Sequence, residues 1–554
     1  MIIINRITLF FLCVIASPVF AAVTDFTALD GMVIQEGGRK KPYLVFAQEA
    51  LQSVSGKTAL TIDGVKWNAP TLITTMWLQP QGWEAKPLVL INNLHLKKEL
   101  GLPQEQKWFT YEQLASNIRF RELLNEATTL RQQDSRAKLK GLPKEASEVG
   151  LRMAQFEALN KGSLFRVVAN AEKADGPWST IPEFVAVQPS AGAPLIAGLT
   201  ALQNALQSGN QAEFDKQAIA LENSLRTIHP EFFPSDQKLK TELTYQRTHP
   251  FRWAWICYAI AAIILALTSL RGRHEGYLAG WLFILIGFGF QIYGFVCRII
   301  VGGRPPVTNM YESVIWVACG AIFFALIFEA IYRGRYFFLG AAPVAVIALI
   351  LADTQPLILN KAINPLVPVL RDNFWLTTHV LTITLSYAAF LLAMGVGHIA
   401  LGMIALKKQP PSSLYNYIYR TLQVGVLLLA TGTILGGVWA NYSWGRFWDW
   451  DPKETWALIA LLTYLFVLHG RIAGSWSGFG LAVGSVLCFL SVMMAWYGVN
   501  FVLGVGLHSY GFGSGGFSTV GTFVALDLAF VGFSIYRHRQ MSAEKKFPAS
   551  QIPA

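Results

Sequence analysis

From residue 251 onward, the chain consists of long apolar segments joined by short polar loops. A helix needs about 20 apolar residues to cross a bilayer, and in lipid its backbone polar groups must bond to one another. Charged residues make up only 14% of the chain, well below the roughly 25% of soluble domains. We therefore predict a polytopic α-helical membrane protein. Its transmembrane helices, about nine in number, are expected near 253–270, 278–300, 313–332, 337–351, 376–405, 421–440, 455–470, 479–500 and 518–536.

The chain before residue 251 is polar and mixed in pattern. Arg6, an apolar stretch at 7–16 and small residues up to Ala21 have the form of a signal peptide, 1–21. We expect cleavage after Ala21, with an uncleaved anchor as the alternative. Residues 22–250 are then an extracytoplasmic α+β domain. Its β-prone runs lie at 58–62, 71–78 and 87–91, and its helical patterns at 110–133, 144–160 and 195–228.

Basic residues indicate how the spans are oriented. If the domain 22–250 lies outside, the loops that fall in the cytoplasm all carry Lys or Arg, as the positive-inside rule requires. These loops are 271–276, 333–336, 407–420, 469–471 and 537–539, followed by a cytoplasmic tail, 541–554, whereas 301–312, 352–375, 439–454 and 501–516 lie outside. The net charge of +11 then reflects topology rather than nucleic-acid binding. The expected location is the bacterial inner membrane, with the membrane domain at 251–540.

The segment WANYSWGRFWDWDPKETW, 439–456, is unusually rich in tryptophan and also carries Arg446, Asp449 and Asp451. Isolated indoles at helix ends form the ordinary interface belt of membrane proteins. Several indoles together with an arginine and carboxylates in one polar loop indicate a platform for a flat, apolar, anionic ligand instead. Arg446 and Lys453 are placed to neutralise the acidic groups of such a ligand, with solvated cations at a helix end as the alternative.

Two histidines flank this segment on the same expected face of the membrane. His379 lies just inside the outer end of the span 376–405, and His508 lies in the outer loop after 479–500. A lone histidine is more often a satisfied polar residue, but two imidazoles around a tryptophan platform suit the axial positions of haem iron. At a rise of about 1.5 Å per residue, His398 and His469 lie roughly 20 to 30 Å deeper. The histidines therefore suggest an outer and an inner site for one ligand, with haem iron as the metal.

Several motifs together resemble a known family of haem-handling proteins. WGRFWDWDPKETW resembles the WWD signature, and GRPPVTNMYES (303–313), THVLTITLSYAAF (378–390), YLFVLHGR (464–471) and GVNFVLGVGLHSYGF (498–512) are similar to CcsA (ResC). CcsA is the haem-bearing component of the system II cytochrome c synthase. The resemblance covers roughly 290–515. Residues 22–250 resemble, less closely, the periplasmic domain ahead of CcsA in some fused or extended members.

The resemblance implies a role for each matching residue. His379 and His508 would be the outer axial ligands, and His469 would receive haem b from the inner side. Trp444, Trp448, Trp450 and Asp451 would hold the porphyrin. The pairing of His398 with His469 lies outside the family pattern and rests on depth alone.

The same resemblance implies the partners and the reaction. A ResB (CcsB) membrane subunit and apocytochrome c would be required, and the product would be haem attached to a CxxCH site by a cytochrome c synthase, or haem lyase. The five cysteines form no CxxC pair, so a separate protein would reduce the thiols. The alternatives are a CcmF-like haem lyase of system I, a haem exporter without attachment chemistry, and a membrane protein with only an aromatic belt.

Overall fold

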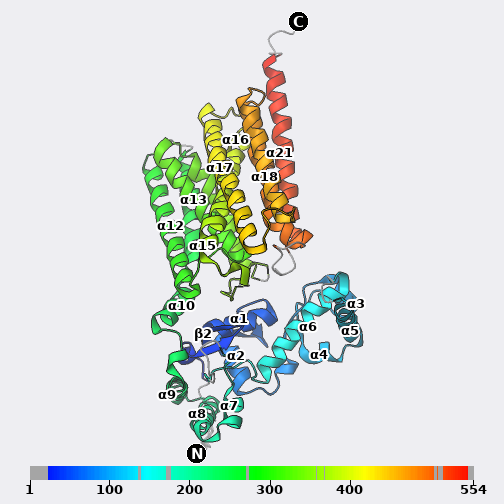
Figure 1. Ribbon diagram of the computed structural model, residues 1–554, viewed down its shortest axis with the longest axis vertical. Coiled ribbons are helices and arrows are strands. Elements are labelled where there is room, and N and C mark those ends of the chain that lie inside the picture. Colours follow the sequence, from blue (N-terminus) through cyan, green and yellow to red (C-terminus); the bar gives the residue numbers. More distant parts are fainter. Residues whose placement is uncertain are drawn as a thin grey trace, which may run out of the picture. The chain divides into compact units, whose positions relative to one another are not determined.

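The computed structural model divides the chain into two compact units, Met1–Ser235 and Asp236–Ala554 (Figure 1). It describes residues 23–134, 139–169, 176–269, 274–356, 358–366, 368–504, 508 and 516–546. The expected signal peptide, 1–21, and the end of the expected tail, 547–554, lie outside the described residues. The sequence placed the domain boundary at 250, whereas the contacts group helix α10, Asp236–Thr248, with the second unit.

The N-terminal unit is mainly helical and contains three two-stranded antiparallel sheets, which confirms the α+β prediction. The strands are β1 (Val33–Glu36) with β2 (Arg39–Pro42), β3 (Ala59–Ile62) with β4 (Val65–Asn68), and β5 (Pro87–Leu90) with β6 (Trp108–Thr110). The helices are α1 (Tyr43–Ser55), α2 (Ala69–Leu78), α3 (Leu94–Glu99), α4 (Tyr111–Ser116), α5 (Ile118–Gln133), α6 (Gly141–Asn160), α7 (Ile181–Val187), α8 (Pro189–Gln207) and α9 (Gln211–Arg226).

The strand predicted at 71–78 is wrong, because this segment forms helix α2. The side chain of Asn68 caps the helix by accepting a hydrogen bond from the backbone N–H of Thr71 at 2.9 Å. Pro70 lies in the first turn, where its missing N–H costs nothing. These start signals outweigh the β-prone residues that follow.

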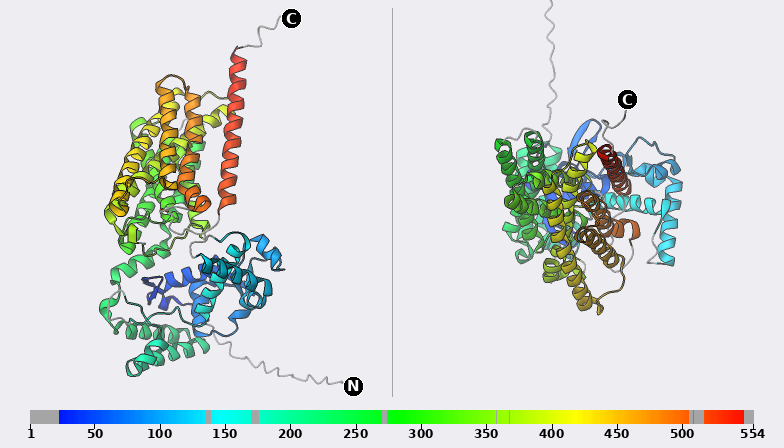
Figure 2. Two further views of the ribbon diagram at one scale, coloured as in Figure 1. Left: turned by 45° about the vertical axis from the view of Figure 1, so that its right-hand side comes forward. Right: turned by 90° about the horizontal axis from the view of Figure 1, so that it is seen from above.

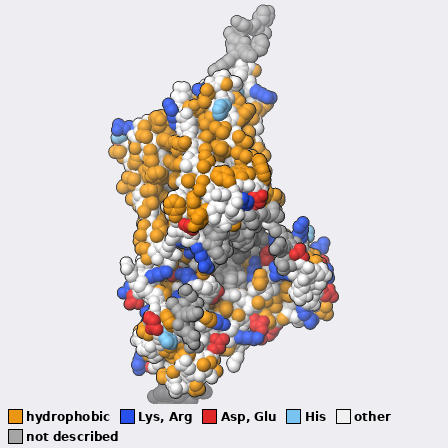
Figure 3. Space-filling model, in the orientation of Figure 1, with side chains coloured by type: hydrophobic (Ala, Val, Ile, Leu, Met, Phe, Trp, Pro, Cys, Tyr) orange, Lys and Arg blue, Asp and Glu red, His pale blue; other side chains and the backbone are white. Residues whose placement is uncertain are grey.

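The second unit confirms the prediction of a polytopic membrane protein. Within the described residues, nine helices are long and apolar enough to cross a membrane, and hydrophobic side chains cover the visible side of this bundle (Figure 3). The helices run roughly alongside one another (Figure 2). They are α10 with α11 (Pro250–Ser269), α12 (His274–Gly302), α13 (Met310–Tyr332), α14 (Tyr336–Thr354), α15 (Asn373–Trp375) with η5 (Leu376–Val380) and α16 (Leu381–Ala405), α17 (Ser412–Trp444), α18 (Pro452–Ile472), α19 (Gly478–Leu487) with α20 (Phe489–Met493) and η6 (Met494–Leu503), and α21 (Phe517–Lys546).

Helix α16 is the central element of the bundle and packs against α13, α14, α17 and α19. Small residues allow these close approaches, since a Cβ on Gly395 would lie 2.3 Å from the carbonyl oxygen of Gly340 on α14. Ahead of α16 the chain adopts the π-helical turn η5, and η6 is π-helical as well. Such segments often occur at functional sites.

Helix ends define the tryptophan segment. Helix α17 continues through Trp444 and stops at Gly445, whose φ of 70° is left-handed. Helix α18 starts after Asp451, which forms a capping box with Glu454. The polar connection is therefore only residues 445–451, and the indoles of Trp439 and Trp444 project from a helix.

Candidate functional site

A cavity lies at the end of the bundle where α13 and α18 begin and α17 ends. Both predicted outer histidines, His379 and His508, line this cavity. Trp444, Trp448 and Lys453 line it as well. The structure therefore brings together five side chains that come from three separate parts of the sequence.

His379 is held against α17 by its position in the π-helical turn η5. Its Nδ1 lies 2.8 Å from the carbonyl oxygen of Gly432, so that nitrogen donates as N–H. Gly436 makes room for the ring, since a Cβ there would lie 2.5 Å from Cε1 of His379. The ring also packs edge-on to Trp439, with centroids 5.7 Å apart. Among the described residues, no side chain or backbone group bonds to Nε2.

His508 is oriented by a carboxylate instead of a carbonyl. Its Nδ1 lies 2.9 Å from Oδ1 of Asp451, and its ring meets the Trp444 ring at 89° with centroids 5.2 Å apart. Asp451 is buried, and the same Oδ1 accepts the backbone N–H of Lys453 at 2.9 Å. In the described part of the chain, Nε2 of His508 has no hydrogen-bond partner. Asp451, expected to hold the porphyrin, thus contacts a histidine and caps a helix.

The tryptophans of the predicted platform do not all face the cavity, because the local backbone points their side chains in different directions. Trp444 and Trp448 line the cavity, whereas Trp450 has a left-handed φ of 56° and its side chain is largely exposed. Trp450 meets Trp448 edge-to-face at 6.0 Å. Trp439 and Trp496 line the cavity in addition.

The two predicted cations have different surroundings. Arg446 binds Glu454 at 2.9 Å through Nη1 and lies 3.5 Å from Asp449 through Nε, while its Nη2 is buried and has no partner among the described groups. Lys453 lines the cavity, and its Nζ lies 3.5 Å from Oδ1 of Asn500. Over the described ranges, Lys453 forms no ion pair. Lys453 is therefore the cation that the cavity wall presents.

Other lining residues were not predicted from the sequence. Met310, Tyr387 and Asn500 face the cavity, and Nδ2 of Asn500 lies 3.5 Å from Sδ of Met310. All three lie within motifs quoted for the family resemblance. Membership of those motifs is the signal that could have identified them.

The two inner histidines are not joined by any described contact. His398 places Nε2 2.7 Å from Oδ1 of Asp527 on α21 and Nδ1 2.9 Å from the carbonyl oxygen of Met394, so both ring nitrogens are engaged. His469 is exposed near the end of α18, with Nδ1 2.8 Å from the carbonyl oxygen of Leu465. All four histidines thus have Nδ1 bonded, but Nε2 of His469 has no partner among the described residues, as in the outer pair, whereas Nε2 of His398 is bonded to Asp527.

Known proteins resemble this part of the chain. The family model described as "Cytochrome C assembly protein" matches residues 307–508, which begin and end at residues that line the cavity. The cytochrome c biogenesis protein CcsA of Guillardia theta is 35% identical over 262 residues, or 41% of this chain and 85% of that protein. CcsA of Pyropia yezoensis is 36% identical over 296 residues, or 45% of this chain and 91% of that protein. The chain belongs to the CcsA family. Membership in this cytochrome c biogenesis family implies haem handling during cytochrome c maturation.

A further similarity reaches beyond the CcsA core. Protein NrfI of Wolinella succinogenes is 28% identical over 497 residues, which cover 85% of this chain and 53% of NrfI. The chain thus spans about half the length of that relative. Because the membrane unit makes up less than two thirds of the chain, this match must include part of the N-terminal unit.

The cavity of this CcsA family member has a donor set that fits haem. Each outer imidazole donates through Nδ1 and leaves Nε2 for iron, the usual arrangement of a metal-binding histidine. Indole faces suit a flat apolar ring, and the ammonium group of Lys453 suits a carboxylate.

Proposed function

We propose that this chain binds haem b with His379 and His508 as axial ligands and presents it for covalent attachment to the CxxCH site of apocytochrome c. The observation that carries this proposal is the shared cavity, in which both imidazoles have Nδ1 bonded and Nε2 unpartnered among the described residues. The chain would thus be the haem-presenting subunit of a system II cytochrome c synthase.

The surrounding residues would supply positioning. Trp444 and Trp448 would restrict the plane of the ring, and Lys453 would bind a propionate. Fixing the vinyl groups beside the incoming thiols would provide most of the rate, because alignment converts a bimolecular reaction into an effectively unimolecular one. The histidine of the CxxCH site would then replace one of the two axial imidazoles.

The synthase would need partners. A ResB (CcsB) subunit would complete an inner site around His469, which is exposed on α18 and bonds through Nδ1 to its own helix. The sequence has no CxxC pair, so a separate protein would reduce the apocytochrome thiols. In the bacterial inner membrane, the basic loops would place the cavity and the N-terminal unit on the periplasmic side.

We assign the N-terminal unit to docking of the partner subunit or the apocytochrome. No group of His, Cys, Asp and Glu that could hold a metal occurs among its described residues. Deleting 23–235 while keeping an export signal should leave haem bound but lower attachment. Full attachment by the shortened chain would contradict docking, and loss of the membrane protein would favour a folding role.

Absorption spectra of the purified chain provide the first test. We expect a bis-histidine haem spectrum that His379→Ala and His508→Ala lose and that added imidazole partly restores. His229→Ala, a change at an exposed histidine of the N-terminal unit, is the control. His469→Ala should lower haem at the outer cavity because loading is upstream. Colourless wild-type protein would refute the proposal.

Coexpression with an apocytochrome and a ResB subunit tests attachment. A synthase yields haem that stays with the cytochrome in acid acetone. Bound haem without such a product would indicate an exporter instead.

A further inference from the structure

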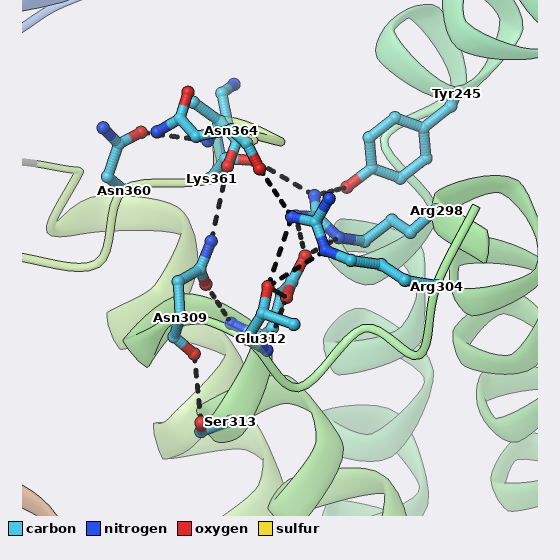
Figure 4. Close-up of polar contacts among 11 residues, drawn as sticks. Tyr245, Arg298, Arg304, Asn309, Glu312, Ser313, Asn360, Lys361 and Asn364 are labelled. Carbon is cyan, nitrogen blue, oxygen red and sulfur yellow. Dashed lines mark hydrogen bonds and ion pairs between the residues drawn. The ribbon is translucent and has the colours of Figure 1, made fainter. Parts of the chain in front are cut away.

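A buried ion pair lies behind the cavity wall formed by the start of α13. Arg298 on α12 and Glu312 on α13 are each only 2% exposed. Nη2 of Arg298 lies 2.6 Å from Oε1 of Glu312, and Nε lies 3.2 Å from the same oxygen (Figure 4). Neither residue lines the cavity. The pair is therefore outside the set of residues that would touch haem.

Glu312 fixes the turn that forms the wall. Its Oε2 accepts two hydrogen bonds from Thr308, from the backbone N–H at 2.8 Å and from Oγ1 at 2.7 Å. Its own backbone N–H donates to Oδ1 of Asn309, the N-cap of α13, at 2.8 Å. Thr308, Asn309 and Met310 line the cavity. The carboxylate thus holds Thr308 in place, and the backbone N–H of Glu312 fixes the side chain of Asn309.

Arg298 connects the same pair to two other segments. Its Nη1 donates to Oη of Tyr245 on α10 at 3.2 Å and to the carbonyl oxygen of Lys361 at 3.0 Å. Beside it, Nη2 of Arg304 donates to the carbonyl oxygen of Asn364 at 2.7 Å. The chain from 358–366 leads to η5, which carries His379. One ion pair therefore joins α10, the start of α13 and the segment that precedes a candidate axial ligand.

Stability alone is a weak reason for such a pair. Desolvating two charges costs about as much as their attraction returns, so apolar residues of similar size often serve as well. We infer that Arg298 and Glu312 are positioning residues for haem, an inference that rests on the function proposed above. The pair fixes the cavity wall at 307–310 against the segment 358–366. In this way it sets the width of the cavity and the position of His379.

Glu312→Gln tests this inference, with Glu329→Gln as the matched control. Glu329 is a fully buried carboxylate of the same helix, but it bonds to Tyr277 at 2.9 Å and does not line the cavity. We expect Glu312→Gln to lower haem per protein several-fold or to alter its ligation spectrum, while Glu329→Gln keeps the wild-type spectrum. A wild-type spectrum and normal haem content in Glu312→Gln would overturn the inference.

Two further variants separate positioning from folding. Arg298→Met with Glu312→Met removes both charges and keeps side-chain volume, and Tyr245→Phe removes one hydroxyl outside the cavity. We expect both proteins to accumulate and to show at least a twofold change in the concentration of imidazole that displaces the native ligand. If the double variant fails to accumulate and Tyr245→Phe behaves as wild type, the pair is structural and the inference fails. A colourless wild-type chain would instead refute the proposed function itself.

Discussion

Nδ1 of His508 lies 2.9 Å from Oδ1 of Asp451, and that oxygen also caps the N-terminus of α18. One carboxylate therefore fixes a candidate iron ligand and the first turn of the helix that carries Lys453. A carboxylate that accepts from a ligating histidine fixes its tautomer and raises its basicity. The contact therefore indicates that Asp451 of the tryptophan segment orients the imidazole of His508.

Asp451→Asn should separate the two roles of this residue. Asparagine caps helices about as well as aspartate, but it removes the negative charge beside His508. We expect haem affinity to fall about 10- to 100-fold, as for other changes to partners of metal-binding histidines. Haem transfer to apomyoglobin measures the loss. Asp449→Asn, which changes a largely exposed carboxylate of the same loop, is the control, and equal transfer rates for the two variants would contradict the assignment.

Gly436→Ala should displace His379 without changing any polar group. The new Cβ would lie 2.5 Å from Cε1 and 3.0 Å from Nδ1 of the ring, so the ring must move away from the carbonyl of Gly432. We expect a haem defect like that of His379→Ala, again partly restored by imidazole. Alanine favours a helix over glycine by up to about 1 kcal/mol, so helix propensity does not explain a loss.

The control for this change is Gly402→Ala in α16, where no atom lies within 4 Å of the added Cβ. Absorption spectra and thermal unfolding of both variants give the comparison. Wild-type haem ligation in Gly436→Ala would mean that the ring has another stable position.

The sequence identified the spans because length and hydropathy are local properties of each segment. It also placed His379 and His508 on one face, since topology alone decides which helix ends meet. It did not show that Trp450 points outward or that Arg446 pairs with Glu454, because the left-handed turns at Gly445 and Trp450 redirect neighbouring side chains. The depth of His398 along α16 likewise did not predict the direction in which its side chain points. In the structure it points towards Asp527.

Lys453→Gln should weaken haem binding through the propionates. Charged hydrogen bonds are worth about 1.5 to 3 kcal/mol, so we expect roughly a tenfold or greater loss of haem affinity. Haem dimethyl ester has no carboxylates, and its affinity should be the same for the variant and the wild type. Titration with the two compounds measures the difference.

Arg446→Gln should behave differently, because Arg446 holds Glu454 and Asp449 and does not line the cavity. We expect it to weaken haem and the dimethyl ester equally. A loss confined to haem would instead assign a propionate to its buried Nη2.

His398 and Asp527 are expected to hold α21 in the bundle rather than to bind haem. Asp527 lies on α21 and is only 6% exposed, although only 17% of the apolar stretch of that helix is buried. Its partner among the described residues is His398, whose Nε2 lies 2.7 Å from Oδ1 of Asp527. An unpaired Asp within a membrane costs about 2.5 to 3.5 kcal/mol on insertion scales. His398→Leu should therefore lower thermal stability, and His398→Leu with Asp527→Leu should recover it, with haem per folded protein unchanged in both. His469→Ala, in contrast, should lower haem without this loss of stability. A stable double variant that lacks haem would contradict the prediction and assign His398 to an inner haem site.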